Sequence, residues 1–416
     1  MPRTSSSGGP PSPNATPPAS NDDAGGLPSV EGVSPEIMRL ATSVALGYIV
    51  SPGPGKRKHG DATARGMNFA DFGHTFCRLG EPGFTQVFDI VEHGLKLAAA
   101  DSDDEDLDGL QPGDLRPAKT DEERIRDGSW RILCDGIPGF ENAMISATAE
   151  RALRRQVCTQ LHKAIQDQRG NDTGGLKYAL LDWIHFDTTQ SLNPPISKQE
   201  NSKSFRGWNH PVTAALLCPI EFEPIDDTYA GIKEGRITAS AQQWPRFCYP
   251  DGHEYVPGQE IVGLFKGYLC VRSSKHIFMG PSSALKGPGL SSSRSPNAKR
   301  IGMTRMTPRA LAYVLIQLWF ALSSLQHWPG SEAAKSNGQE DDQFNIAVFW
   351  RNIVSFFDDG NGQDVLDFYD YEVFGIRRGG SNVVRERGTG AQSAMERIRA
   401  ERSEEARKRA RLDTEP

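Results

Sequence analysis

One apolar stretch, "ALAYVLIQLWFALSSL" at residues 310–325, constrains the fold more than any other part of the chain. It is shorter than the roughly 20 apolar residues that a transmembrane helix needs, and Gln317 interrupts it. Thr307 precedes it at an N-cap position and Pro308 at the first helical position, where both residue types are favoured. The sequence therefore predicts a buried helix in a soluble protein and no membrane span.

Helical spacing of apolar residues recurs on both sides of this stretch. Residues 83–100 place apolar side chains on one face, and Thr120 begins a further helix with acidic residues in its first turn. Residues 140–170 form the clearest amphipathic helix, and Gly170 is its predicted end. Residues 344–357 form another helix. The pattern favours a mainly α fold over alternating strands and helices or a β-sandwich.

The periodicity is less regular between Trp208 and Pro288, where Pro and Gly recur often and argue against long helices. Pro211 and Pro219 mark the start and the end of one short helix. Residues 259–280 fit either a helix or a short hairpin, and the periodicity leaves that choice open. We therefore expect an irregular Pro/Gly-rich middle section.

Composition divides the chain into three parts. The first residues are rich in Ser, Pro and Gly, and such a segment has too few apolar side chains to offset the entropy of ordering. We expect a disordered N-terminal arm at residues 1–66, with a short helix and a basic cluster. One large folded helical domain follows at 67–375, with an acidic loop at 101–118. A disordered, charged and basic C-terminal tail occupies 376–416.

Short basic clusters stand in both arms, although the chain has a net charge of −6. Such clusters act as nuclear import signals or contact nucleic acid. The N-terminus lacks a charged-then-apolar leader, so we expect an intracellular protein, nuclear or cytoplasmic. The candidate import residues are Lys56, Arg57, Lys58, Arg407, Lys408, Arg409 and Arg411.

The six cysteines are widely spaced and form no Cys-x-x-Cys pair, so we expect them to be reduced and mostly buried. Two pairs, Cys248 with His253 and Cys270 with His276, supply the residue types of a tetrahedral zinc site. Their spacing is not that of a zinc finger, and separate buried thiols are the simpler interpretation. We assign no metal and no cofactor.

His185 and Asp187 form a His-x-Asp pair. With a distant histidine, this is the ligand order of an iron(II) site that leaves positions open for oxygen. His253 or His276 is the candidate third ligand. Other enzyme signatures are absent from the sequence: there is no Gly-x-Ser-x-Gly elbow, no Gly-x4-Gly-Lys phosphate loop and no His-Glu-x-x-His. Enzymatic activity is therefore kept as an alternative.

A basic segment, residues 294–309, leads into the start of the apolar helix. Cations and free backbone N–H groups at such a place bind phosphates, while a solvated basic loop is the alternative interpretation. The candidate nucleic-acid contacts are Arg294, Lys299, Arg300, Arg305 and Arg309.

Six blocks occur in order along the chain: "LLDWI" (180–184), "RGWNHPVTAALLCP" (206–219), "WPRFCY" (244–249), "KHIFMGPSSA" (275–284), "NAKRIGMTRMTPRALAYV" (297–314) and "QLWFALSS" (317–324). Together they resemble a family of uncharacterised proteins present in many copies in mushroom-forming fungi. The resemblance covers about residues 84–374. That family has no assigned activity, so the resemblance implies no mechanism. His185, Asp187 and His253 lie outside the blocks.

The block at residues 206–219 has two interpretations. In the first, Trp208 and Val212 pack, and a short buried helix ends at Pro219. In the second, polar side chains of two blocks line one pocket that binds a ligand. The candidate pocket residues are Arg206, Asn209, His210, Lys275 and His276.

We expect a non-enzymatic interaction protein, located in the nucleus, that binds a protein or nucleic-acid partner through basic segments. The alternative is an enzyme with a polar pocket near His210 and His276, such as an iron(II)-dependent oxygenase that uses His185 and Asp187. The sequence does not predict the oligomeric state.

Overall fold

The computed structural model describes residues 69–103, 119–146, 151–199, 202–291, 295–329 and 344–377, together with residue 402. Within these ranges all regular structure is helical, apart from a single bridge between Pro219 and Pro245. The prediction of a mainly α fold is confirmed. The arm at 1–66, most of the acidic loop and nearly all of 376–416 lie outside the described residues. These include every candidate import residue.

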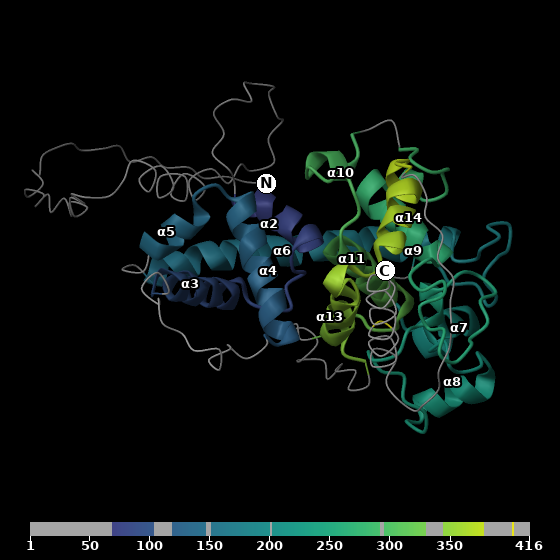
Figure 1. The fold of residues 1–416 in the computed structure, drawn as a ribbon. Helices are drawn as coiled ribbons and strands as arrows, with labels where there is room; N and C mark the ends of the chain where they lie inside the picture. The colour runs from purple at the N-terminus through teal and green to yellow at the C-terminus, as the bar shows by residue number, and fades with distance from the viewer. Residues whose placement is uncertain are drawn as a thin grey trace, which may run out of the picture.

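Five helices form the N-terminal half of the described fold, on the left of Figure 1. Helix α6 has 29 residues, so it is about 44 Å long. It packs on α2 and α3 and also on α11, and thereby joins the two halves. The five helices are α2 (Phe69–Leu79), α3 (Val87–Asp103), α4 (Asp121–Gly136), α5 (Phe140–Ser146) and α6 (Arg151–Ala179).

The C-terminal half is arranged around α11 (Figure 1). Every residue of this helix from Ala310 to Leu322 is buried, which confirms the buried helix that the apolar run predicted. Helix α11 contacts α2, α6, α7, α9 and α13. The helices of this half are α7 (Pro211–Leu217), α8 (Asp226–Lys233), α9 (Tyr268–Ser274), α10 (Asn297–Arg300), α11 (Pro308–Leu322), α13 (Ile346–Phe356) and α14 (Gln363–Phe374).

The helix starts follow the local signals in the sequence. Thr120 and Glu123 form a reciprocal capping box at the start of α4, which satisfies two backbone N–H groups that the helix leaves free. The Thr307 hydroxyl accepts a hydrogen bond from the backbone N–H of Ala310. Pro211 stands in the first turn of α7, as predicted.

The predicted helix at 140–170 is wrong at its end. The structure describes α5 over Phe140–Ser146 and α6 from Arg151 through Gly170 to Ala179, and residues 147–150 lie outside the described residues. Glycine costs a helix only about 1 kcal/mol per residue. Arg169 donates to the carbonyl of Pro82, just after α2, and Asp172 and Thr173 bond to side chains of α11. Tertiary contacts therefore hold the helix across a residue that would end it in isolation.

The sequence left the structure of residues 259–280 open and did not predict helix α14. The 259–280 segment contains α9, which continues into a π-helical turn, Lys275–Met279, so the helical alternative holds for its second half. Helix α14 was not predicted. Gly362 and Gly375 bound it with left-handed φ values of 69° and 73°, a conformation that glycine adopts without strain.

The main core is a continuous cluster of buried apolar side chains that runs from Phe69 to Val373, and Ala214, Cys218 and Tyr229 form a small second cluster. The aromatic centre of the main core is Phe265, whose ring lies 5.1 Å from that of Trp244 and 5.1 Å from that of Phe356. Phe265 has a positive φ of 61°, which is rare for a bulky residue. No helix of the described ranges has the length and apolarity required to cross a bilayer.

Candidate functional site

Arg206 and Lys203 lie at the ends of two helices and not in an open pocket. The Arg206 guanidinium donates to the carbonyls of Ala321 and Lys177, each at 2.7 Å. The Lys203 ammonium donates to the carbonyl of Phe320 at 2.6 Å. These carbonyls belong to the last turns of α11 and α6, where acceptors are left over and cations are favoured. Both side chains therefore cap helix C-termini.

Asn209 and His210 also hold the backbone. His210 accepts from the N–H of Val212 through Nδ1, and its Nε2 lies 2.7 Å from the carbonyl of Pro194. Asn209 donates to the carbonyl of Ser204 at 2.9 Å. Residues 206–210 thus hold a loop against the start of α7 by hydrogen bonds.

Lys275 and His276 stand on the π-helical turn. The Lys275 ammonium donates to the Lys286 carbonyl at 3.0 Å and to the Glu372 carboxylate at 3.3 Å. His276 is buried beside the ring of Trp183, and burial lowers its pKa. No hydrogen bond in the described chain joins these two residues to Arg206, Asn209 or His210. The five candidates form two separate groups.

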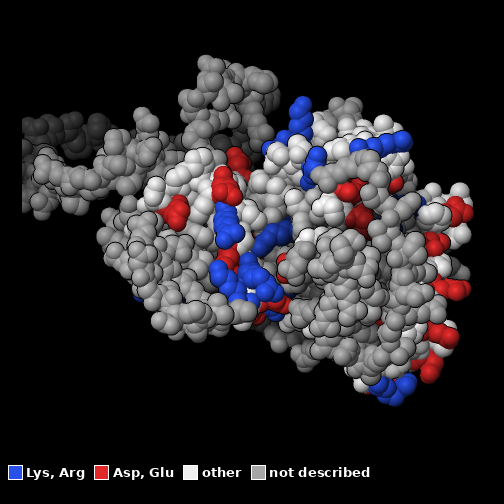
Figure 2. All heavy atoms as spheres, in the orientation of Figure 1, with Lys and Arg blue, Asp and Glu red and all other residues white. Residues whose placement is uncertain are grey.

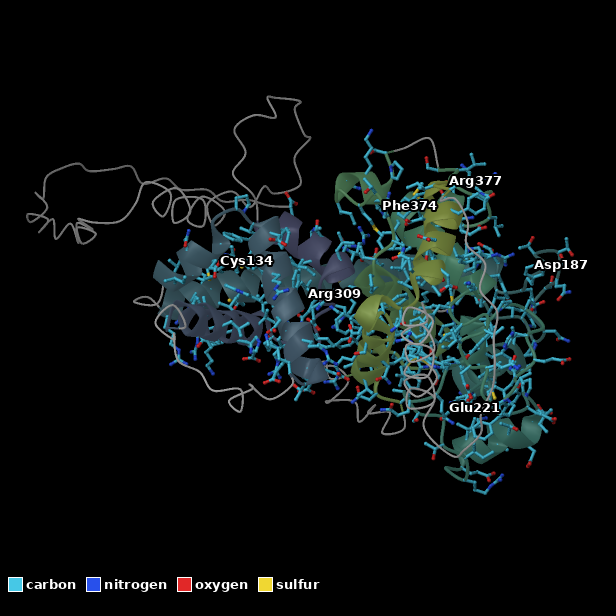
Figure 3. The ribbon with its side chains drawn as sticks, viewed as in Figure 1. Cys134, Asp187, Glu221, Arg309, Phe374 and Arg377 are labelled. Atoms are coloured by element: carbon cyan, nitrogen blue, oxygen red, sulfur yellow. The ribbon has the colours of Figure 1, made fainter. Side chains whose placement is uncertain are left out.

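The metal hypotheses find no support in the arrangement of the side chains. No three His, Cys, Asp or Glu side chains of the described residues come together as a group that would hold a metal ion. Asp187 is exposed at the edge of the molecule (Figure 3) and accepts from Thr189. The His253 ring stacks on that of Tyr249 at 4.8 Å. Within the described residues, the side chains considered for an iron site and for a zinc site are thus not brought together as one group of possible ligands.

The cysteines are free thiols, as predicted, and all but the half-buried Cys134 are buried. Burial raises the pKa of the thiols of Cys77, Cys134 and Cys158 to about 12 and that of Cys218 to about 11. Because the thiolate is the nucleophile, these four groups are poor candidates for nucleophilic catalysis at neutral pH.

The basic segment divides into an outward and an inward part. Lys299, Arg300 and Arg305 are exposed, and Figure 2 shows Lys and Arg side chains gathered over α10. Arg309 turns inward and donates to the carbonyls of Gly80 and Ile125. Arg309 is therefore not available to a nucleic acid in the manner that the sequence suggested. Arg294 lies outside the described residues.

The backbone under the three exposed cations is fixed from several sides. The amide of Asn297 donates to the carbonyl of Ile277 at 2.8 Å. The N–H of Met306 donates to the carboxylate of Asp370 at 2.8 Å, and Ala298 is buried between them in the chain. The segment at 297–306, which comprises α10 and the loop after it, thus presents its cations from a fixed backbone, and we call it the basic turn.

A buried polar network in the centre of the molecule was not predicted. Arg78 of α2 makes a bidentate pair with Asp172 of α6, at 2.8 and 2.6 Å. The Tyr313 hydroxyl of α11 donates to the same carboxylate at 2.7 Å. Gln317 donates to the Tyr313 hydroxyl and accepts from Thr173. The network thus ties three helices together by hydrogen bonds and one buried ion pair.

The only local signal for this network was Gln317, the polar residue within the apolar run. Arg78 and Asp172 are 94 residues apart, so no spacing rule connects them. Because all members have partners, the network fixes the register of α2, α6 and α11. It leaves no free acid, base or nucleophile for catalysis.

Glu81 caps the segment before α3 from within the core. The residue is 1% exposed, and its carboxylate accepts from the backbone N–H groups of Gly83, Phe84 and Thr85 at 2.7–3.1 Å. Burial disfavours the charged form and raises the pKa of Glu81 to about 7, although the three N–H donors oppose that shift. Glu81 is therefore a group whose protonation is linked to folding.

We expect the free energy of unfolding to fall as pH rises from about 4.5 to about 7, by roughly 2–3 kcal/mol from Glu81 alone. In that window the folded state keeps a proton that the unfolded state has released. Urea unfolding of the wild type and of Glu81→Gln at several pH values measures the effect. Because other groups also titrate in this range, the contribution of Glu81 is the difference between the wild-type and the Glu81→Gln plots of unfolding free energy against pH. Parallel curves would show that Glu81 stays ionised in the fold.

The described part of the chain is thus helical, with an apolar core, a buried polar network and an exposed basic turn, and it brings together no three side chains that would hold a metal ion. It belongs to a family of unknown function (DUF6698), whose model matches residues 163–374. No curated protein and no solved structure matches the chain. The match begins within α6, whereas α2 to α5 precede it and share one apolar core with the matched part.

Proposed function

We propose that this chain is a non-enzymatic interaction protein that binds an acidic partner, a nucleic acid or an acidic protein surface, through basic segments. The observation that carries the proposal is the ordered turn that exposes Lys299, Arg300 and Arg305. No ion pair with a carboxylate of the described chain engages these three cations within 4.0 Å. Exposed cations that make no ion pair within the described residues, on a fixed backbone, suit contact with phosphates or carboxylates.

The candidate catalytic groups support a non-enzymatic role. The polar side chains proposed for a pocket serve as helix caps or backbone fasteners. The histidines and the aspartate proposed for iron are not assembled into one site within the described residues. Nuclear location belongs to the same proposal, and it rests on the basic clusters at 56–58 and 407–411.

The test is binding of the full-length chain to pools of single-stranded RNA and duplex DNA across a salt series. We expect affinity to fall as salt rises, because cations that contact phosphates release counterions. The triple variant K299A/R300A/R305A is expected to reduce the slope of log affinity against log salt by roughly 2–3 in magnitude, if each cation contacts one phosphate. Fluorescence anisotropy measures both slopes.

The matched control removes the same charge elsewhere. Lys96, Lys163 and Lys233 are exposed and lie on α3, α6 and α8, away from the basic turn. The variant K96A/K163A/K233A should keep the wild-type slope. Equal slopes for both triple variants would show that binding depends on net charge and not on this turn. Pull-down with both triple variants applies the same comparison to an acidic protein partner.

A further inference from the structure

A cleft with a volume of about 460 Å³ lies between α4 and α13, bordered by the first turn of α11. Figure 2 shows Lys, Arg, Asp and Glu side chains gathered at the centre of this face. The volume falls within the range of about 300–1,000 Å³ that is typical of small-molecule sites. Most of the lining is apolar, from the side chains of Leu79, Ile125, Ile132, Val354 and Phe357.

Three of the charged residues that line the cleft form one cluster with one another. Arg124 pairs with Asp121, and its Nε lies 3.7 Å from the carboxylate of Asp358. Their side chains are 40–48% exposed, so this cluster lies at the solvent side of the cleft. It carries one positive and two negative charges and does not itself attract an anion.

Arg309, the fourth charged residue, lies deeper, with its guanidinium carbon 5.5 Å from the ring centre of Trp350, and only some of its N–H donors have hydrogen-bond acceptors in the described chain. Its Nη1 donates to Gly80 and Ser129, and its Nη2 donates to Ile125. A guanidinium has five N–H donors, so the Nε–H and the second Nη2–H have no partner in the described chain.

The charge of Arg309 also lacks a paired carboxylate. Glu81 and Asp358 are close enough to act on it electrostatically, yet neither forms an ion pair with it within 4.0 Å. Burial lowers the pKa of Arg309 to about 10, which is still far above neutral pH, so the cation is present. An anion that reached it would supply the missing charge and two missing acceptors, in the fork geometry that suits a carboxylate.

The start of α11 adds to the same preference. Arg309 is at the second position of this 15-residue helix, where the aligned peptide dipoles leave partial positive charge. Pro308 has no N–H, and the side chain of Thr307 already accepts from Ala310. The helix start therefore favours an anion beside Arg309 through its dipole, and not through N–H groups of Pro308 or Ala310.

We propose that this cleft binds a small organic acid, with its carboxylate on the free N–H groups of Arg309 and its apolar body between α4 and α13. The cluster of Arg124 with its two aspartates, which carries a net negative charge, stands at the mouth, so the anion is held by Arg309 and not by this cluster. The ligand class is a monocarboxylate with an aliphatic or aromatic body, because the remaining walls offer apolar contact.

The test uses decanoate as the probe and decanol as its neutral counterpart, titrated calorimetrically into the full-length protein. We expect saturable binding of decanoate below about 1 mM and binding of decanol at least about tenfold weaker. Arg309→Lys keeps a positive charge but loses the fork, and should weaken decanoate binding about tenfold. Val354→Trp fills the apolar part of the cleft without touching Arg309, and should abolish binding.

Arg126→Lys is the matched control. Arg126 lies on the same helix α4, pairs with Glu122 and does not line the cleft, so this variant should bind decanoate as the wild type does. Circular dichroism checks that each variant is folded. If Arg309→Lys does not fold, the binding of decanoate to Val354→Trp tests the proposal in its place. The proposal is overturned by equal binding of decanol and decanoate, by wild-type binding in a folded Arg309→Lys or in Val354→Trp, or by no saturable binding below about 1 mM.

Discussion

Replacing Asp172 with alanine is expected to lower the free energy of unfolding by about 3–5 kcal/mol. The side chains of Arg78 and Asp172 are each 9% exposed. Removal of the carboxylate leaves the Arg78 charge buried without its partner, and the Tyr313 hydroxyl loses its acceptor. Urea unfolding followed by circular dichroism measures the change.

The matched comparison replaces the pair together. The double variant Arg78→Met with Asp172→Leu removes both charges, and we expect it to be much closer to the wild type than Asp172→Ala. Glu234→Ala, which breaks the exposed pair with Arg236, should leave the unfolding midpoint nearly unchanged. A small effect of Asp172→Ala would mean that water or a neighbouring group takes over the bonding of Arg78.

Phe265→Ala is expected to cost about 3–5 kcal/mol of unfolding free energy. Its side chain is fully buried among aromatic rings, and the neighbouring helices limit how far the cavity collapses. Differential scanning calorimetry or urea unfolding detects a loss of this size. Phe265→Leu keeps most of the volume and should cost less than about 1.5 kcal/mol.

The backbone at Phe265 permits a sharper comparison. Because its φ is +61°, alanine there keeps the strain of the left-handed region, about 1 kcal/mol, whereas glycine does not. Phe265→Gly should therefore be as stable as Phe265→Ala, or slightly more stable. At the buried helical residue Phe349 of α13 the order should reverse, with Gly worse than Ala by about 1 kcal/mol. The same order at both positions would contradict a left-handed backbone at Phe265.

Much of the fold followed from short-range patterns. The mainly α class, the buried helix α11 and the caps at Thr120, Thr307 and Pro211 were all predicted from neighbouring residues. Each of these signals acts within about one helical turn, through a cap, a fixed φ or an apolar face. The end of α6 was predicted wrongly at Gly170, because contacts with α2 and α11 outweigh the local propensity of glycine. Helix α14 was missed because its two glycine boundaries were not recognised as caps.

The candidate site was predictable only in part. The exposed cations Lys299, Arg300 and Arg305 were named from the sequence, and the structure places them on one ordered turn. Arg309, four residues further along, is indistinguishable from them by composition, yet its first helical turn points it into the interior. Arg206 and His210 have the residue types of a polar pocket, and they serve instead as caps and fasteners.

By itself, then, the sequence determined the mainly α class, the starts of several helices, and that one of them is buried on all sides. Only the tertiary structure decided which polar groups meet: Arg78 with Asp172 across 94 residues, and Arg309 with the carbonyls of α4 and of the segment after α2. The physical reason is range. Capping and periodicity depend on atoms a few residues apart, whereas a buried charge selects its partner from whatever the packing of the helices brings within hydrogen-bond distance.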